Sequence, residues 1–377
     1  MNDTFTLKTK VYAGKESIRL LKTISGSAAC IITDGIMAEL GYLGQAVELL
    51  RQAGMESHVF QDVRPDPNTE IITAGLEVFR SSGADVLVAL GGGSVIDTAK
   101  AILYGAWKMD EASFKRPQFI AIPSTSGTGS EVTDFSVITV DGSKVVIVDE
   151  RIAPDIAILD SVCLQHVPNK VVADTGIDVL VHAIEAYVSI HATDFTDALA
   201  EKAVQLVFAH LETLYRDPAD AYARDRIQNA SCMAGMAFTN ANLGLNHSLA
   251  HALGGRFHIS HGRANAMMLL PVMEFNACLC GGGGERERTR YAHLAALLHL
   301  PARTAREGTA SLIEASRNLM RKLDIPPSIR TLSIEREAFT TALPDMAEAA
   351  LRDRCTPSAP RQGTKEELIA LYEKAYQ

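Results

Sequence analysis

Histidines gather in one short stretch of this sequence. Four of the chain's 11 histidines lie within fifteen residues that are otherwise largely apolar: His247, His251, His258 and His261. In an earlier segment, Asp178 and His182 stand four residues apart in an apolar pattern typical of a helix, which places both side chains on one helix face. One carboxylate and several imidazoles suit Fe(II), Zn(II), Mn(II) or Co(II), and a set without thiolates is not a structural zinc pattern. The residues predict a mononuclear metal site with an open coordination position.

Spacing alone does not choose the ligands within the histidine cluster. We expect His247 and His251 to share a helix face, Gly254-Gly255 to end that helix, and a short loop to fold His261 back toward it. The alternative is a set of hydrogen-bonded core histidines plus one surface histidine, a description that suits His258. A histidine beyond the needs of the metal is also suited to relay a proton, because its ordinary pKa lies near neutrality.

Two glycine- and hydroxyl-rich loops follow predicted strands and suit a dinucleotide. Gly91-Gly92-Gly93-Ser94 lies between a strand at 85–90 and a helical pattern, where glycines allow close backbone approach and a helix N-terminus attracts pyrophosphate. Its spacing is not the GxGxxG of a Rossmann fold, and such glycines also serve packing alone. Residues 123–131 follow the strand at 119–122 and carry five hydroxyl side chains in seven residues, at the sheet edge where ligands bind.

Asp34 stands at the end of the first predicted strand. A carboxylate there accepts hydrogen bonds from an adenosine ribose and repels a 2′-phosphate, which favours NAD over NADP. On local grounds an N-cap or turn aspartate before Gly35 explains the residue nearly as well.

The elements that must position these residues fall into two halves. Residues 1–165 alternate β-branched runs with helical patterns, which predicts an α/β domain with strands at 28–33, 57–60, 85–90, 119–122 and 156–159. A hairpin is expected at 135–140 and 144–148 around Asp141-Gly142. Residues 166–377 predict an all-helical domain, with helical patterns at 171–188, 196–214, 221–239, 244–254, 291–298, 309–323 and 365–376. Residues 281–288 are interpreted as a polar loop.

Composition limits the classes of partner. The chain has 377 residues, a formal net charge of -9 and no lysine- or arginine-rich block, so nucleic acid is not an expected partner. No apolar run is long enough for a membrane helix and the N-terminus does not read as a signal peptide, so we expect a cytoplasmic protein. The six cysteines are scattered and interpreted as reduced thiols, and Cys278-Leu279-Cys280 is a weak ligand set.

Taken together, the motifs resemble the iron-containing alcohol dehydrogenase family over nearly the whole chain. The matching residues occur in the family's order and spacing: Gly91-Gly92-Gly93-Ser94 with Asp97 and Lys100, residues 123–133, Gly176-Ile177-Asp178 with His182 and Glu185, and residues 246–265. Within the family the chain is similar to short-chain primary alcohol dehydrogenases of the propanol and ethanol class associated with bacterial microcompartments. Residues 192–202 are part of that likeness.

The resemblance implies a fold and a metal site. The fold would be a dehydroquinate synthase-like architecture, with an α/β dinucleotide-binding domain at 1–165, an all-helical catalytic domain at 166–377, and the site in the cleft between them. One divalent metal would be bound by Asp178, His182, His247 and His261. The resemblance implies Fe(II) as this metal, with Zn(II) as the alternative. His251 would lie at the active site without being a ligand, in a position to relay a proton.

The resemblance also implies how NAD binds. Asp34 would meet the adenosine ribose, and Lys144 the nicotinamide-side ribose. The pyrophosphate would be bound at the first loop, by Gly92, Gly93 and Ser94. The remaining cofactor contacts would come from the second loop and from the helix after the glycines, with Thr125, Ser126, Thr128 and Asp97 as the expected residues.

The expected activity is NAD(H)-linked interconversion of small primary alcohols and aldehydes. The resemblance also implies a homodimer and allows its enclosure in a bacterial microcompartment. Rival interpretations are a glycerol dehydrogenase-like polyol oxidoreductase, a dehydroquinate synthase-like lyase, and a nucleotide-sensing protein that kept the fold. The lyase needs several basic groups for a phosphorylated, carboxylated substrate, whereas only Arg256 and Arg263 lie near the metal motifs. The sensing protein is disfavoured because both predicted sites look intact.

Overall fold

The chain divides into two units between Val167 and Pro168. The structure is a computed structural model that describes residues 4–140, 143–279 and 284–377. One unit is Thr6–Val167, and the other is Pro168–Gln377 with Thr4 and Phe5. The sequence predicts the division after residue 165.

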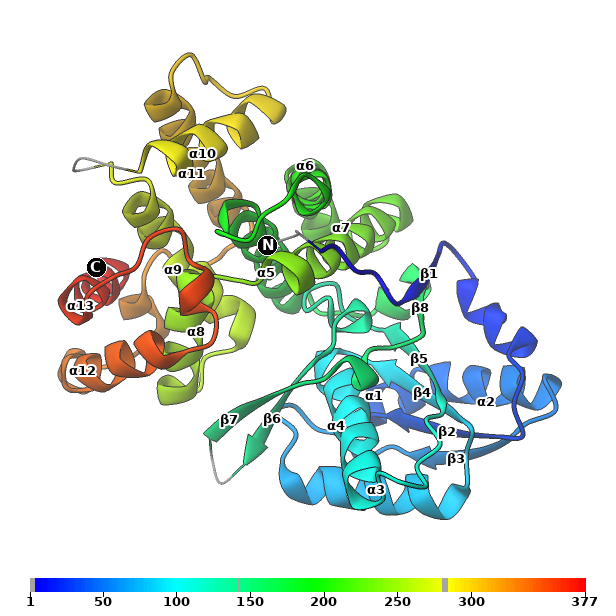
Figure 1. Cartoon of the computed structure of the whole chain (residues 1–377). Coiled ribbons are helices and arrows are strands. Elements are labelled where there is room, and N and C mark those ends of the chain that lie inside the picture. The colour runs from blue at the N-terminus through cyan, green and yellow to red at the C-terminus, as the bar shows by residue number, and fades with distance from the viewer. Residues whose placement is uncertain (1–3, 141–142, 280–283) are drawn as a thin grey trace. The chain divides into compact units, whose positions relative to one another are not determined.

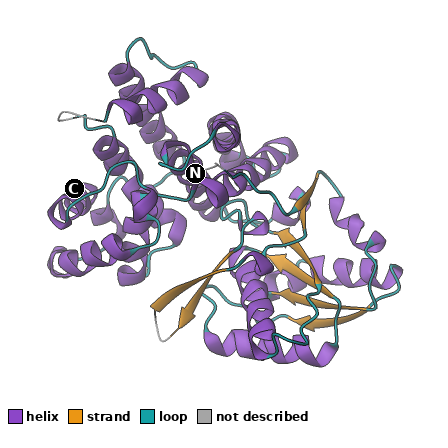
Figure 2. Ribbon diagram, viewed as in Figure 1, coloured by secondary structure: helices purple, strands orange, loops and turns teal. Residues whose placement is uncertain are grey.

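A six-stranded parallel sheet forms the first unit (Figures 1 and 2). Its spatial order is β1 (Lys10–Ala13), β8 (Ile156–Leu159), β5 (Gln118–Pro123), β4 (Val86–Gly91), β2 (Ala28–Thr33) and β3 (Glu56–Phe60). All five pairings are parallel, so the carboxyl ends of the strands meet at one edge. The chain order reverses between β2 and β4, and such a switch point is where open α/β sheets bind ligands.

Helices cover both faces of this sheet. Along β4, Val86, Val88 and Leu90 face one apolar core, and Leu87 and Ala89 face the other, as the two-residue period of a strand requires. The first core is completed by η1 (Ser17–Thr23), α1 (Gly35–Glu39), α2 (Tyr42–Gln52) and η4 (Ser161–Leu164), and the second by α3 (Thr69–Ser82) and α4 (Gly93–Met109). Burial on both faces explains why the strands are nearly continuous apolar runs.

The predicted strands and the hairpin are confirmed, and one strand was not expected. The hairpin strands β6 (Phe135–Val140) and β7 (Ser143–Val148) pair antiparallel, while Asp141-Gly142 lies outside the described residues. Two short helices flank the hairpin, η2 (Ser130–Val132) and η3 (Glu150–Ile152). Strand β1 was missed because it has four residues at the sheet edge and is mostly exposed, which leaves no apolar alternation to recognise.

All the regular secondary structure in the described residues of the second unit is helical (Figure 2). Its helices are α5 (Asn169–Val188), α6 (Asp194–Arg216), α7 (Ala221–Ala241), α8 (Leu245–Phe257), α9 (His261–Asn276), α10 (Glu285–Leu297), α11 (Ala305–Lys322), η5 (Ile329–Leu332), α12 (Arg336–Arg352), η6 (Thr356–Ser358) and α13 (Lys365–Tyr376). Helix α5 is buried along nearly its whole length and packs against α6, α7 and α9. No described helix is both long and apolar enough to cross a membrane.

The sequence patterns did not predict helices α9 and α12. Each contains a proline, Pro271 in α9 and Pro344 in α12, which reads as a helix breaker. Helix α9 is also buried on most sides, including the polar Arg263 and Asn265, so it lacks an amphipathic stripe.

Two predicted helix boundaries are wrong. Gly254-Gly255 does not end α8, which continues to Phe257 and is capped by His258 in the left-handed conformation, with φ of 54°. Residues 285–288 are not a loop but the first turn of α10, where the acidic Glu285 and Glu287 complement the helix dipole. Residues 281–283 of the predicted loop, and Cys280, lie outside the described residues.

Candidate metal centre and cofactor-binding loops

Helix α5 supplies the first two predicted ligands. Asp178 and His182 lie one turn apart on α5 and are only 2% and 3% exposed. The His182 ring stacks on Phe238 of α7, with centroids 4.6 Å apart. Burial raises the pKa of the Asp178 carboxyl, against the opposing effects of nearby histidines and of a hydrogen bond from Asn265. A carboxylate this buried needs a positive partner, and a divalent cation is one.

His247 of α8 meets α5 from the facing side. Its Nδ1 lies 2.5 Å from Glu185 Oε2, and Glu185 Oε1 accepts a hydrogen bond from the Asn246 backbone N–H at 2.6 Å. Its Nε2 is buried and has no hydrogen-bond partner among the described residues, although it lies 4.0 Å from Asp178 Oδ1. Burial, followed by repulsion from the neighbouring histidines, lowers the pKa of His247 well below its ordinary value. The ring is therefore neutral, as metal binding requires.

The start of α9 brings in His261. Gly262 lies so close to α5 that an added Cβ would be 2.3 Å from the Asp174 carbonyl oxygen, and no other residue type allows this approach. Arg263 donates to the buried Asp174 carboxylate at 2.6 Å, and Ser260 Oγ donates to it at 3.1 Å. These contacts hold both sides of His261, whose own side chain is 42% exposed.

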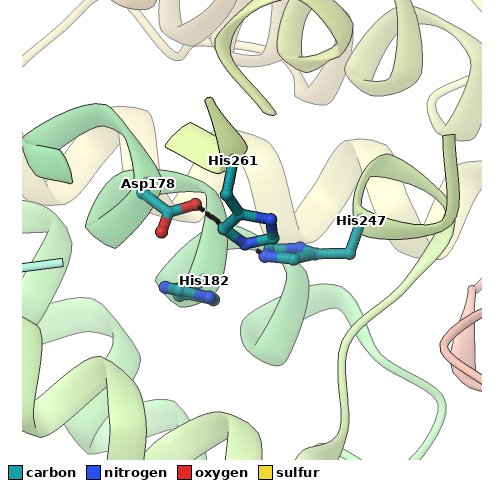
Figure 3. Close-up of side chains that lie close together, drawn as sticks. All are labelled: Asp178, His182, His247 and His261. Carbon is teal, nitrogen blue, oxygen red and sulfur yellow. Dashed lines mark ion pairs between the residues drawn. The ribbon is translucent and has the colours of Figure 1, made fainter. Parts of the chain in front are cut away.

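The four predicted ligands converge. Figure 3 shows Asp178, His182, His247 and His261 pointing toward one another, and each offers a ligand atom within 4.8 Å of the others. Asn265 joins two of them, because its Nδ2 lies 2.7 Å from Asp178 Oδ1 and 3.1 Å from His261 Nε2. The buried, unpartnered nitrogen of His247 and the buried Asp178 carboxylate fit one divalent metal of the iron or zinc kind.

The remaining two histidines of the cluster lie outside this set. His251 follows His247 by one turn of α8, and its ring lies 5.3 Å from that of His261. Its Nδ1 is 2.8 Å from Asp353 Oδ2. His258 is exposed at the end of α8. Asp353 and the role of Glu185 beside His247 are what the sequence analysis missed.

The two cofactor loops lie together at the carboxyl edge of the sheet. The loop after β5 packs on the start of α4, because a Cβ on Gly93 would lie 2.6 Å from the Thr128 side chain and one on Gly92 would lie 3.3 Å from Thr125. Ser94 belongs to the first turn of α4, and Ser126 is buried. The glycines thus allow two loops to meet where a pyrophosphate would bind the helix N-terminus.

Asp34 lies at the end of β2, beside this switch point. Its side chain accepts a hydrogen bond from the Met37 backbone N–H at 3.0 Å and caps α1. The N-cap role left open by the sequence is therefore present, and this contact does not test the predicted ribose role.

Asp97 and Lys144 make contacts within the protein. Asp97 accepts hydrogen bonds from Ser130 Oγ at 2.7 Å and from the Val137 backbone N–H at 3.2 Å. Lys144 of β7 forms an ion pair with Asp66. Neither contact tests the predicted cofactor roles, but the Asp97 contacts tie α4 to the second loop and the hairpin.

Buried Lys100 strengthens that connection. Its Nζ donates to Ser130 O, Thr133 Oγ1 and Phe135 O at 2.6 to 2.9 Å. Burial lowers the pKa of Lys100 to about 8, partly offset by the Asp97 carboxylate. Lys100 thus fixes the backbone that follows the hydroxyl-rich loop.

Comparisons with known proteins cover both units. The family model described as iron-containing alcohol dehydrogenase matches residues 8–161, and that of the Fe-containing alcohol dehydrogenase family, C-terminal, matches residues 172–376. The chain is 39% identical to the 1-propanol dehydrogenase PduQ of Salmonella typhimurium, covering 99% of each chain. It is 38% identical to an NADPH-dependent butanol dehydrogenase of Clostridium saccharobutylicum, over 99% of this chain and 97% of the relative.

A solved structure agrees with these relatives. The iron-containing alcohol dehydrogenase of Thermococcus thioreducens superposes with a TM-score of 0.91 at 36% identity, covering 99% of each chain. The fold is therefore shared over nearly the full length of both chains.

Proposed function

The chain belongs to the iron-containing alcohol dehydrogenase family, and from this premise we propose that it interconverts small primary alcohols, of the ethanol and 1-propanol class, with their aldehydes. As a member it is an NAD(H)-linked oxidoreductase that uses a metal. The observation that carries the proposal is the convergence of Asp178, His182, His247 and His261, which are the ligands we assign. The names of the propanol and butanol dehydrogenase relatives support the substrate class.

The proposed division of labour follows from the chemistry of each group. When bound, the metal supplies a Lewis acid that stabilises negative charge on a substrate oxygen, and NAD⁺ accepts the hydride. His251 lies beside the ligand set with a partly exposed ring, which suits the transfer of a proton between substrate and solvent. The residues proposed to bind the cofactor are Gly92, Gly93, Ser94, Asp97, Thr125, Ser126, Thr128 and Lys144. Asp97 and Lys100 also hold residues 130–137, which follow the second loop.

A direct assay tests this proposal. The protein, purified and reconstituted with Fe(II) or Zn(II), is given NADH with acetaldehyde, propanal or butanal, and NADH consumption is followed by absorbance. We expect metal-dependent turnover of all three aldehydes and little oxidation of glycerol. Preference for glycerol would support the polyol oxidoreductase instead. Absence of turnover with any aldehyde and either metal would contradict the dehydrogenase assignment and favour the lyase or the nucleotide-sensing protein.

The choice between NAD and NADP is proposed to depend on Asp34. The butanol dehydrogenase relative is named NADPH-dependent, so the family does not settle the choice. A carboxylate at the end of β2 repels a 2′-phosphate. Replacing Asp34 with alanine should raise the ratio of NADPH- to NADH-linked kcat/KM. An unchanged ratio would show that Asp34 does not select NAD over NADP.

We also propose a homodimer in the cytoplasm or within a bacterial microcompartment, on the family resemblance and the named propanol dehydrogenase relative. Light scattering of the purified protein tests the dimer. Co-purification with shell proteins from the native host tests enclosure.

A further inference from the structure

Asp353 lies beside the proposed proton-relay histidine and belongs to no motif of the sequence. It follows α12 directly, and its Oδ2 is 2.8 Å from His251 Nδ1 on α8. The two residues are 102 positions apart in the chain. The side chains are partly buried, at 31% exposure for His251 and 18% for Asp353.

The Asp353 carboxylate is held in place from its other side. Its Oδ1 accepts a hydrogen bond from the Cys355 backbone N–H at 2.8 Å and lies 3.3 Å from Ser248 Oγ. Burial opposes ionisation, but the hydrogen bond and charge of His251 and the hydrogen bonds from Cys355 together keep the pKa of this carboxyl below its ordinary value. Both oxygens are therefore occupied, and the group is a fixed negative charge.

A negative acceptor at Nδ1 decides which nitrogen of His251 carries the proton. In its neutral form the ring satisfies this acceptor only by donating Nδ1–H, which leaves Nε2 with a lone pair. The same contact fixes the ring, which lies with its centroid 5.3 Å from that of His261 and 5.9 Å from that of His247. The ring is thus oriented beside the ligand set with one nitrogen able to take up a proton.

We propose that Asp353 is a positioning residue, which holds His251 in its Nδ1–H tautomer and orientation so that Nε2 exchanges the substrate proton. This inference rests on the proposed function. In alcohol oxidation, hydride leaves carbon for NAD⁺, the hydroxyl proton passes to His251 Nε2, and the carbonyl double bond forms. The resulting imidazolium is balanced by the Asp353 charge and then releases a proton from Nε2 to water.

A second metal bound by His251, Asp353 and Cys355 is the competing interpretation of this cluster, because their ligand atoms lie within 4.8 Å of one another. The geometry favours the positioning role. Both Asp353 oxygens already accept hydrogen bonds, and burial raises the pKa of Cys355 well above its ordinary value, so its sulfur stays a thiol rather than a thiolate ligand. Two metal ions per chain in the purified protein, with the second lost in Asp353→Asn, would overturn the proposal.

A double-mutant cycle tests the positioning role in the metal-loaded enzyme. Asp353→Asn presents an amide that donates to Nδ1 and stabilises the wrong tautomer, so we expect kcat to fall about 10²-fold. The KM for aldehyde and the metal content should stay within a factor of about two. In a His251→Gln background the same change should cost less than about threefold, because the group it positions is gone. Equal losses in both backgrounds would overturn the proposal.

Control variants separate positioning from stability. Asp353→Glu keeps the charge and should recover at least about a tenth of wild-type kcat, which a steric role would not allow. Glu201→Gln removes the carboxylate 3.1 Å from His293 Nε2 in the same unit and should leave kcat unchanged. Should Asp353→Asn fail to fold, ¹⁵N chemical shifts of His251 in zinc-loaded wild-type protein decide the matter: a protonated Nδ1 supports the proposal and a protonated Nε2 overturns it.

The outcomes distinguish this inference from the proposed function. Wild-type protein that turns over no alcohol or aldehyde would remove the dehydrogenase proposal itself. Active wild-type protein whose two substitutions act additively would remove only the role of Asp353.

Discussion

Two histidines one turn apart on α8 each lie within hydrogen-bond distance of a carboxyl group, yet their surroundings give them opposite properties. His247 pairs with Glu185 at 2.5 Å, and both side chains are almost fully buried. His251 pairs with Asp353 at 2.8 Å, and both are partly exposed. The buried pair directs an unpartnered nitrogen toward Asp178 and suits a metal. The partly exposed pair is accessible to solvent and suits proton transfer.

The pKa values of the two carboxyl groups differ in the same way. Burial raises the pKa of Glu185 to about 7 despite hydrogen bonds from the backbone of Asn246, Gly244 and His247. For Asp353 burial also acts to raise the pKa, but the hydrogen bond and charge of His251 and the hydrogen bonds from Cys355 together lower it. A histidine and a carboxyl group therefore form a buried pair suited to orienting a metal ligand, or a partly exposed pair suited to handling a proton, according to how much water reaches them.

Replacing His247 or His251 with alanine should give the largest difference between the two pairs, in metal content and in turnover. His247→Ala removes a ligand and should reduce metal content below about a tenth of wild type, with turnover at least about 10³-fold lower. His251→Ala should keep its metal and lose about 10²-fold in kcat. Elemental analysis and steady-state assays on both proteins check this, with His258→Asn as the control because asparagine tolerates the left-handed conformation there. Metal loss in His251→Ala would erase the distinction.

Glu185→Gln tests whether the buried carboxyl orients His247 for the metal. We expect metal affinity to fall about 10- to 100-fold, because an amide fixes the ring less well and lowers its basicity. Competition with a chromophoric chelator measures the change. Asp353→Asn is the matched variant and should leave this affinity unaltered. Equal affinities for wild type and Glu185→Gln would show that Glu185 contributes packing alone.

Two glycines near the ligand set, Gly262 in α9 and Gly255 in α8, test how closely α9 packs against α5. Gly262→Ala places a methyl group 2.3 Å from the Asp174 carbonyl, which should displace His261 and cost about 1–3 kcal/mol of stability. Gly255→Ala meets nothing within 4 Å inside α8 and should stabilise the unit by about 0.5–1 kcal/mol. Thermal unfolding with metal analysis separates them. A Gly262→Ala protein with normal Tm and metal content would contradict the close approach of α9 and α5.

Ser248→Ala should have the smallest effect on the exposed pair. Its Oγ lies 3.3 Å from Asp353 Oδ1, a long contact, while the Cys355 N–H remains bound at 2.8 Å. We expect kcat to fall no more than about twofold, which corresponds to less than about 0.5 kcal/mol. Steady-state kinetics at saturating aldehyde measures it. A loss as large as that of Asp353→Asn would mean that Ser248, rather than the backbone, holds the carboxylate.

The sequence predicted what its local patterns contain. Asp178 and His182 share a helix period, and the apolar strands predicted the parallel sheet. Pairings between distant segments left no such pattern. Glu185 meets His247 across 62 positions. Asp353 reaches His251 only because α12, a helix with an internal proline, folds beside α8.

Competing contacts explain a second group of differences. Gly254-Gly255 resembles a helix end, but the helix continues to Phe257, and Gly254 instead packs closely against the Ile259 carbonyl, with an added Cβ only 3.1 Å from it. The predicted cofactor residue Asp97 has both carboxylate oxygens bonded within its own unit. A spacing motif identifies such residues but does not show which neighbours they meet.

The central claim, that four side chains bind one catalytic metal, is tested most directly by metal analysis of His261→Ala. His261 is the most exposed of the four, so its loss disturbs the buried core least. We predict that this variant, folded as judged by circular dichroism, retains less than about a tenth of the wild-type metal and of the aldehyde-reducing turnover. Unchanged metal content together with unchanged turnover would contradict the account.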